Sequence, residues 1–144
     1  MRSVKYIVIH CTAGPRNQKT SVILNFWRKK LGWKNVGYHK LISEDGTVEE
    51  LAKPEQIVNG VKGHNSHSYH ICYKGGQGGK DNRTDEQKVS LLSEIKKARK
   101  LFPKAQVLGH RDLSPDLNND GIIQPNEWTK NCPSFDAKKE YEGI

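Results

Sequence analysis

Residues 107–136 read VLGHRDLSPDLNNDGIIQPNEWTKNCPSFD, and the chain is organised around this stretch. It opens with a short apolar run that ends in His110, and its later residues have neither helical nor strand periodicity. Long loops without regular structure are uncommon in compact domains and usually carry function. His110 and Cys132 lie near the two ends of this loop, and their imidazole and thiolate groups are both good zinc ligands.

A third candidate ligand, His10, ends the apolar run of KYIVIHCTAG at residues 5–14. Strand ends hold ligands more rigidly than the middles of loops do. If the strands that end at His10 and His110 are neighbours in a sheet, their terminal side chains converge, and Cys132 joins them from the returning loop. Two histidines and one cysteine without a fourth protein ligand form the donor set of a catalytic zinc with an open position.

The bulk composition predicts one domain that folds around its own core. A chain of 144 residues is long enough for a core without disulfides. Its apolar runs are too short for a membrane helix or a signal peptide, so we expect synthesis in a cytoplasm. Three cysteines at unrelated spacings do not describe a disulfide framework, and Cys11 and Cys72 are either buried thiols or a disulfide pair. The net charge of +8 favours a polyanionic partner: nucleic acid, an anionic membrane or a bacterial wall.

Strands and helices alternate along the chain, which predicts an α/β fold. Thr84 and Gln87 form a capping box before a helix at residues 85–102, whose buried face is expected at Leu92, Ile95 and Leu101. We expect strands at residues 4–9, 36–42, 47–51, 69–74 and 105–110, a helix from Thr20 or Ser21 to Gly32, and a short terminal helix capped by Ser134. The predicted architecture is a single domain with a central mixed β-sheet flanked by helices and a zinc site at the strand ends.

Five segments together resemble the type 2 family of N-acetylmuramoyl-L-alanine amidases. These are zinc amidases of the bacteriophage lysozyme and endolysin type, related to peptidoglycan recognition proteins. The segments are, in order, IVIHCTA, GWKNVGYHKLI with EDGTVE, GHNSHSYHICYKGG, GHRDLSPD and KNCPSFD. The resemblance runs from about Val4 to Asp136, and its most specific pieces are the histidine of the first strand and the Lys-x-Cys-Pro-x-Phe-Asp ending.

The resemblance implies one zinc amidase domain over residues 1–144 that cleaves peptidoglycan between N-acetylmuramic acid and L-alanine. It implies zinc binding by His10, His110 and Cys132, and catalytic assistance by Tyr38 and Lys130. An ammonium group can stabilise the oxyanion of amide cleavage, and a phenol can donate a hydrogen bond. Which of the two handles the proton stays open.

The same resemblance implies a phage or prophage lysin that acts on the cell wall after release. We expect a monomer that binds peptidoglycan and does not insert into a membrane. The alternative is a non-catalytic peptidoglycan-binding module of the same fold, although such modules typically lose the third ligand. A nucleic-acid or polymerase-binding role would rest on charge alone, because the sequence has no aromatic-basic motif to support it.

The chain departs from its relatives in two places. Many relatives have a histidine before the KG-x-N motif, where this chain reads NGVKGHN, so a substrate-groove contact is expected either to be altered or to be supplied by His64 instead. His64, His67 and His70 recur every third residue, yet NSHSYH has no helical character, so we expect solvent or groove contacts rather than a second metal cluster.

The other departure is an insert at residues 114–128, between the second and third zinc ligands. It matches the calcium-loop pattern D-x-[DN]-x-[DN]-G-x5-E at every specified position. Its calcium ligands would be Asp116, Asn118, Asp120, the Ile122 carbonyl and Glu127, with Gly121 allowing the sharp turn. The alternative interpretation is an ordinary loop, because Asp, Asn and Gly are good turn formers.

Overall fold

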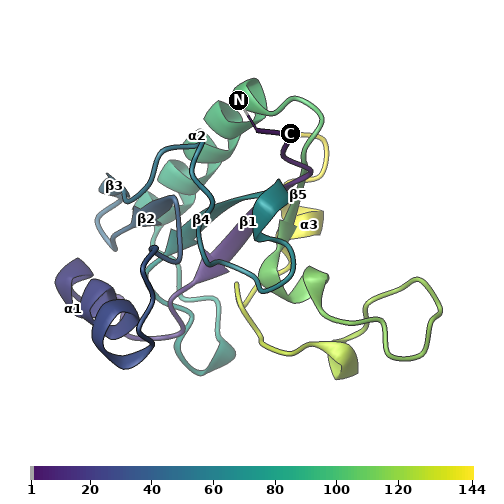
Figure 1. Ribbon diagram of the computed structural model, residues 1–144, viewed down its shortest axis with the longest axis horizontal. Coiled ribbons are helices and arrows are strands. Elements are labelled where there is room, and N and C mark those ends of the chain that lie inside the picture. Colours follow the sequence, from purple (N-terminus) through teal and green to yellow (C-terminus); the bar gives the residue numbers. More distant parts are fainter. Residues whose placement is uncertain (1) are drawn as a thin grey trace.

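The β-branched and aromatic residues near the N-terminus form β1 (Tyr6–Cys11), which lies between β4 (Ser68–Tyr73) and β5 (Gln106–Gly109). In the computed structural model, which describes residues 2–144, the sheet has the strand order β3-β2-β4-β1-β5 (Figure 1). β1 pairs in parallel with both neighbours, and β2 (Lys40–Ile42) is parallel to β4. β3 (Val48–Glu50) is antiparallel to β2. The predicted α/β fold with a mixed sheet is therefore confirmed.

The first predicted helix is irregular in the structure. The helix predicted after Thr20 ends early as an α-helix and continues as a π-helical turn, closed by a hydrogen bond from the Leu31 N–H to the Phe26 carbonyl. Within residues 2–144 the helices are α1 (Thr20–Asn25), the π-helical η1 (Phe26–Lys30), α2 (Asp85–Leu101) and α3 (Ala137–Glu140), with 3₁₀ turns η2 (Asn65–His67), η3 (Gln77–Gly79), η4 (His110–Leu113) and η5 (Pro125–Glu127).

The α2 helix begins at the predicted capping box. The Gln87 N–H donates to the Thr84 hydroxyl at 3.1 Å, and the Thr84 N–H donates to Gln87 Oε1 at 3.0 Å. Its buried face differs from the prediction: Leu91 and Ile95 are fully buried, while Leu101 is 45% exposed. The buried stripe therefore passes through Leu91, Ile95 and Ala98, which are spaced by about one helical turn, and not through Leu92.

The predicted cap of the terminal helix was also wrong. Asp136, and not Ser134, caps α3, since its carboxylate accepts a hydrogen bond from the Lys139 N–H at 3.2 Å. Ser134 lies in the left-handed backbone region with φ 71° and donates its hydroxyl hydrogen to the Gly76 carbonyl. Arg83 packs against Phe135 in the same segment: its guanidinium lies 3.4 Å from the centre of the Phe135 ring.

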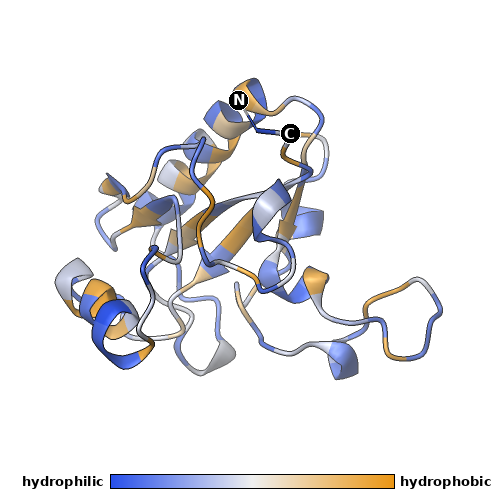
Figure 2. Cartoon of the chain, viewed as in Figure 1, coloured by the Kyte–Doolittle hydropathy of each residue, from blue (hydrophilic) through white to orange (hydrophobic). Residues whose placement is uncertain are grey.

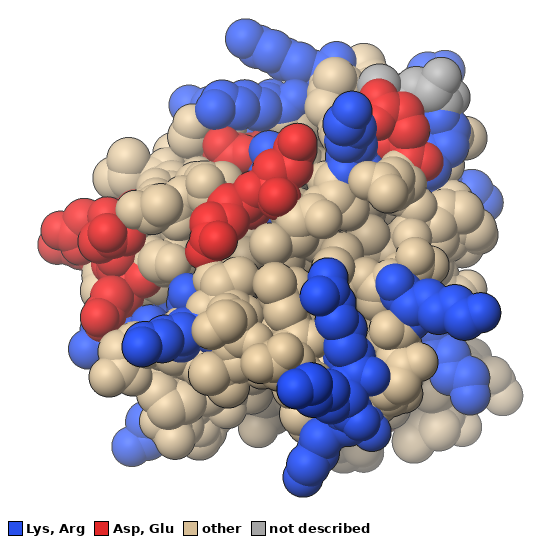
Figure 3. Space-filling view, turned by 60° about the vertical axis from the view of Figure 1, so that its left-hand side comes forward, with Lys and Arg blue, Asp and Glu red and all other residues tan. Residues whose placement is uncertain are grey.

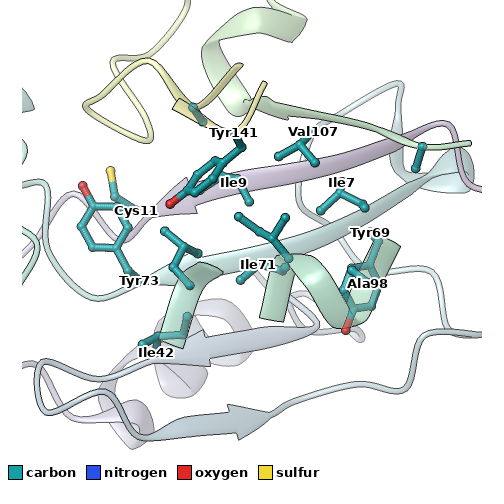
Figure 4. Close-up of a cluster of buried hydrophobic side chains, with 14 of the residues drawn as sticks. Ile7, Ile9, Cys11, Ile42, Tyr69, Ile71, Tyr73, Ala98, Val107 and Tyr141 are labelled. Carbon is teal, nitrogen blue, oxygen red and sulfur yellow. The ribbon is translucent and has the colours of Figure 1, made fainter. Parts of the chain in front are cut away.

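Alternation along the strands divides the core between the two faces of the sheet. Odd-numbered residues of β1 and β4 pack against α2 in the main hydrophobic cluster, which Figure 4 shows around Ile7, Ile9, Ile71 and Tyr73. In Figure 2 the central strands are coloured largely hydrophobic, whereas many residues of the loops around them are hydrophilic. The even-numbered residues, which include His10, therefore face the opposite side, where α1 and η1 pack through Ile23 and Trp27.

The charged side chains and the insert occupy the periphery. On the face drawn in Figure 3, Lys and Arg side chains project in separate groups, and Asp and Glu gather in the upper half. Residues 114–128 form a loop that extends away from the sheet, on the right in Figure 1. Within residues 2–144, no helix is both long enough and apolar enough to cross a membrane.

Candidate metal centre

The topology brings the three predicted donor side chains to one point. His10 lies at the end of β1, and His110 directly follows β5 as the first residue of η4. β1 and β5 are parallel neighbours, so their carboxyl ends meet at the same edge of the sheet. Cys132 returns to this edge from the long loop. One ligand atom from each of the three residues lies within 4.8 Å of the other two.

The geometry of this donor group fits a tetrahedral zinc ion. His10 Nδ1 lies 3.8 Å from Cys132 Sγ, and the rings of His10 and His110 are 4.9 Å apart between centroids. Zinc bonds of ~2.0–2.3 Å in a tetrahedron separate neighbouring ligand atoms by about 3.3–3.7 Å. The set of two imidazoles and one thiol is the donor chemistry that zinc prefers, and the arrangement leaves a fourth position for a non-protein ligand.

Burial tunes the protonation of the three donors. It lowers the pKa of His10 well below the ordinary value, with His110 and His70 adding to the effect. Burial and then the charge of Lys130 lower the pKa of His110 to about 4, so both rings are neutral near pH 7, which is the form that binds a metal. Burial raises the pKa of the Cys132 thiol, so a thiolate at this position needs a neighbouring cation. The Cys11 N–H lies 3.1 Å from Cys132 Sγ and can also donate a hydrogen bond to such a thiolate.

Tyr38 and Lys130 lie beside the donor group. The Tyr38 ring is 5.0 Å from the His10 ring between centroids, and it contacts Trp27 edge-on. Burial raises the pKa of the Tyr38 phenol well above its ordinary value, so the hydroxyl stays protonated and can donate a hydrogen bond. Lys130 is exposed and lines the same hollow as His110 and Cys132, and its charge lowers the pKa of both His10 and His110.

A groove runs over this group of residues. One hollow contains His110, Cys132, Tyr38 and Lys130, and its apolar wall consists of Phe26, Trp27, Leu31 and Trp33. A second hollow continues from it past Lys62 and His64, and the two share Trp33, Asn59, Gly60, His110 and Lys130. A ligand much longer than one sugar or one amino acid can therefore lie across the donor group.

The structure places the remaining histidines differently from one another. His64 lines the second hollow, as expected for a groove residue. The expectation of a solvent or groove contact is wrong for His70, which is fully buried, with its Nδ1 2.8 Å from Nε2 of His10. The signal in the sequence was the position of His70 in the predicted strand at residues 69–74, which indicates burial, whereas its pairing with His10 depends on the strand register.

All three cysteines are free thiols in the described part of the chain. Cys11 packs into the main cluster on the α2 side of the sheet, whereas Cys72 packs with Ile23 and Trp27 on the opposite side. A disulfide between Cys11 and Cys72 would have to pass through the sheet, so the structure favours the alternative of two buried thiols.

Three acidic residues of the insert lie close together. One carboxylate oxygen each from Asp116, Asp120 and Glu127 lies within 4.8 Å of the other two. Glu127 is buried and accepts hydrogen bonds from backbone N–H groups of the loop, including that of Gln124 at 2.9 Å. Asp116 Oδ1 is buried without a hydrogen-bond partner among residues 2–144. Gly121 has φ +79°, which suits the sharp turn that a calcium loop needs.

Comparisons with known proteins point to one family. The sequence profile of the family described as N-acetylmuramoyl-L-alanine amidase matches residues 1–134. The endolysin of Enterobacteria phage K11 is 34% identical over 136 residues, which cover 91% of this chain and 81% of that endolysin. The solved structure of the Ph2119 endolysin from a Thermus scotoductus MAT2119 bacteriophage is 27% identical, with a TM-score of 0.72 over 92% of this chain and 79% of its own. Drosophila PGRP-LB has the same fold, with a TM-score of 0.72 at 18% identity, covering 92% of this chain and 76% of its own.

Proposed function

Because the chain belongs to the N-acetylmuramoyl-L-alanine amidase family, we propose that it hydrolyses the amide bond between N-acetylmuramic acid and L-alanine in peptidoglycan. We propose that the reaction depends on one zinc ion held by His10, His110 and Cys132. The single observation that carries this proposal is the convergence of these three side chains beside a groove that His110 and Cys132 line. The family itself makes the chain a peptidoglycan amidase of the endolysin type.

The bound zinc, Lys130 and Tyr38 would each have a different role in the hydrolysis. Bound zinc would supply Lewis acidity, both polarising the substrate carbonyl and making a water molecule acidic enough to attack near neutral pH. The Lys130 ammonium stabilises the negative charge that develops on the carbonyl oxygen. The protonated phenol of Tyr38 donates a hydrogen bond to the carbonyl or to the attacking water. Either group can supply the proton that the departing L-alanine amine needs.

The geometry also accounts for a long, polymeric substrate. The apolar wall of Phe26, Trp27, Leu31 and Trp33 offers contact area for the sugar or lactyl part, and the second hollow offers Lys62 beside the donor group. The Lys62 ammonium suits a carboxylate of a peptide stem. We propose that the protein works as a monomeric phage or prophage lysin that reaches the wall after release from the cytoplasm.

A non-catalytic peptidoglycan-binding module of the same fold is the second candidate, because the long groove alone would be enough to bind the polymer. Such a module needs the groove but not the donor group. A module that only binds peptidoglycan does not require the complete donor group of His10, His110 and Cys132. It also does not require Tyr38 and Lys130 beside that group. We therefore prefer the catalytic proposal.

Mass spectrometry of digested peptidoglycan separates the two candidates. After treatment with zinc-loaded protein, purified peptidoglycan should release stem peptides with a free L-alanine amine, and the glycan strands should keep intact muramic acid without new reducing ends. Glycosidic cleavage would instead create reducing ends. Saturable binding to the same peptidoglycan without any released peptide would contradict the amidase proposal and support the binding module.

We further propose that residues 1–144 form one domain with an insert at 114–128, and that this insert binds calcium. The ligands would be the side chains of Asp116, Asn118, Asp120 and Glu127 with the Ile122 carbonyl. The three neighbouring carboxylates and the Asp116 Oδ1, buried without a hydrogen-bond partner among residues 2–144, support this proposal. The ion would brace the loop that leads to Lys130 and Cys132, so calcium is coupled to stability rather than to chemistry.

Calcium is expected to raise the melting temperature of the zinc-loaded protein by a few degrees. With a Kd of ~10⁻⁴–10⁻³ M, about 5 mM calcium stabilises the folded state by about 1–2 kcal/mol, or roughly 3–8 °C for a domain of this size. The measurement is a thermal melt in calcium-free buffer against added calcium, with equal magnesium as ionic control. Asp120→Ala, which removes the ligand oxygens at this position, should abolish the shift, and Glu142→Ala, an exposed acid outside the loop, should keep it. An unmoved melting temperature in the parent protein would leave the insert an ordinary loop.

A further inference from the structure

His10 and His70 form a buried pair of imidazoles on one face of the sheet. β1 and β4 are parallel neighbours with Val8 opposite His70 and His10 opposite Cys72, so the two histidines are diagonal neighbours on the even-numbered face. His10 Nε2 and His70 Nδ1 are 2.8 Å apart, and the side chains are 1% and 0% exposed. A hydrogen bond this short between fully buried groups fixes the orientation of both rings.

We propose that His70 is a positioning residue for the zinc ligand His10. In this proposal, which rests on the zinc site proposed above, His70 Nδ1 accepts a hydrogen bond from the Nε2–H of His10. The proton of His10 is thereby kept on Nε2, and the lone pair of Nδ1 is left free for the metal. Ligand histidines commonly donate their second ring N–H to a partner that fixes the tautomer.

The direction of the hydrogen bond follows from the position of the other donors. Nδ1 is the nitrogen of His10 that lies 3.8 Å from Cys132 Sγ, so it is the one that faces the donor group. If His70 were the donor, the neutral His10 ring would carry its proton on Nδ1, between the ring and the metal position. The acceptor role of His70 Nδ1 places its own proton on Nε2, which is buried without a partner among residues 2–144.

The surroundings hold the His70 ring in one place. Its backbone N–H donates to Nδ1 of His39 at 3.0 Å, and the two rings lie parallel, 5.9 Å apart between centroids. His39 is tied in turn to the Gln56 carbonyl at 2.7 Å. On the groove side, Gly60 lies against the ring: a Cβ added there would come 2.2 Å from His70 Nδ1. Only glycine at position 60 leaves room for this imidazole.

The first test compares two replacements of His70 in the full chain. His70→Leu has similar bulk but no acceptor, and His70→Asn keeps an acceptor oxygen close to the position of Nδ1. Zinc affinity is measured by competition with a chromogenic chelator. We expect His70→Leu to weaken zinc binding by about 10–100-fold, the usual cost of losing such a partner, and His70→Asn to restore most of the loss. Equal zinc affinity in His70→Leu and the parent would overturn the proposal.

The tautomer itself can be read in the metal-free protein, which separates this proposal from that of the zinc site. Long-range ¹H–¹⁵N correlations should assign the His10 proton to Nε2 in the parent and to a mixture of nitrogens in His70→Leu. A proton on Nδ1 of His10 in the parent would refute the positioning role even if zinc binds. Failure of the parent to bind zinc would instead refute the metal site, and the tautomer result would then describe only the hydrogen bond between His10 and His70.

Gly60→Ala provides a second variant that leaves His70 in the chain. Its methyl group should push the imidazole off His10 and weaken zinc binding to a similar degree, because the buried ring has no free space to enter. In the His70→Leu background, Gly60→Ala should add little further loss, since the hydrogen bond is already gone. Two fully additive losses would show that Gly60 acts by another route and would count against the proposal.

Discussion

Replacing Cys132 with serine is expected to remove bound zinc and to abolish peptidoglycan hydrolysis. The parent protein should carry about one equivalent of zinc, as a single site with three protein ligands would. A serine hydroxyl does not ionise near neutral pH, so the donor group would fall to the two imidazoles of His10 and His110. Two neutral ligands are too few to hold the ion against dialysis. His10→Ala is expected to give the same result.

The matched control is Cys72→Ala. Cys72 is as buried as Cys132, but its thiol packs among Ile23, Trp27 and Leu41 and is not one of the three converging donors. Elemental analysis after dialysis should find about one zinc per chain in Cys72→Ala and only background in Cys132→Ser. Circular dichroism checks that both variants are folded. A zinc-free Cys132→Ser protein that hydrolyses peptidoglycan at the parent rate would contradict both the metal site and its catalytic role.

The donor group was predictable from sequence because it depends on strand ends. His10 and His110 each close an apolar β-type run, and parallel neighbours bring such ends together without any need to know the register. The α/β class followed from the same alternation of strands and helices. These features depend on local patterns, and local patterns are what a single sequence contains.

His70 was not predictable in this way, because its role depends on strand register. Every residue of β4 is buried, so the strand has no polar and apolar alternation from which to read its two faces. Which residue of β1 lies diagonal to His70 is decided by pairing across a sequence separation of 60 residues. The close approach of Gly60 adds a third segment that no local pattern connects to the other two.

Two smaller errors have similar causes. In α2, both Leu91 and Leu92 lie one turn before Ile95, and the choice between them depends on Ala98, a weakly apolar residue that a sequence pattern undervalues. At the C-terminus, Ser134 and Asp136 are both good capping residues. Ser134 is instead used at Gly76, in a contact between distant segments that settles the choice for Asp136.

Replacing Lys130 with alanine is expected to lower kcat by about 10²–10³-fold while zinc stays bound. The ammonium is exposed at the mouth of the donor group and is not one of the three converging ligands. Its charge lowers the pKa of both His10 and His110 and therefore opposes a bound cation. Zinc affinity in Lys130→Ala should thus be equal to or higher than that of the parent, which separates a catalytic loss from a loss of metal.

Tyr38→Phe is expected to cause a loss of the same order for a different reason. The phenylalanine ring keeps the contacts with His10 and Trp27 and removes only the hydroxyl, which burial keeps protonated as a donor. Because the donor acts on charge that develops in the transition state, the loss should fall on kcat and leave KM close to the parent value. Fold, zinc content and melting temperature should stay at parent values.

Lys139→Ala and Tyr6→Phe are the matched controls for this pair of variants. Lys139 is an exposed lysine of α3, and Tyr6 contacts His64 and His67 and is not one of the three donors. Rates come from peptide release by purified peptidoglycan at a fixed zinc load, measured for all four variants. Parent rates in both Lys130→Ala and Tyr38→Phe would remove these residues from the mechanism. A rate lost only together with zinc would make them parts of the metal site instead.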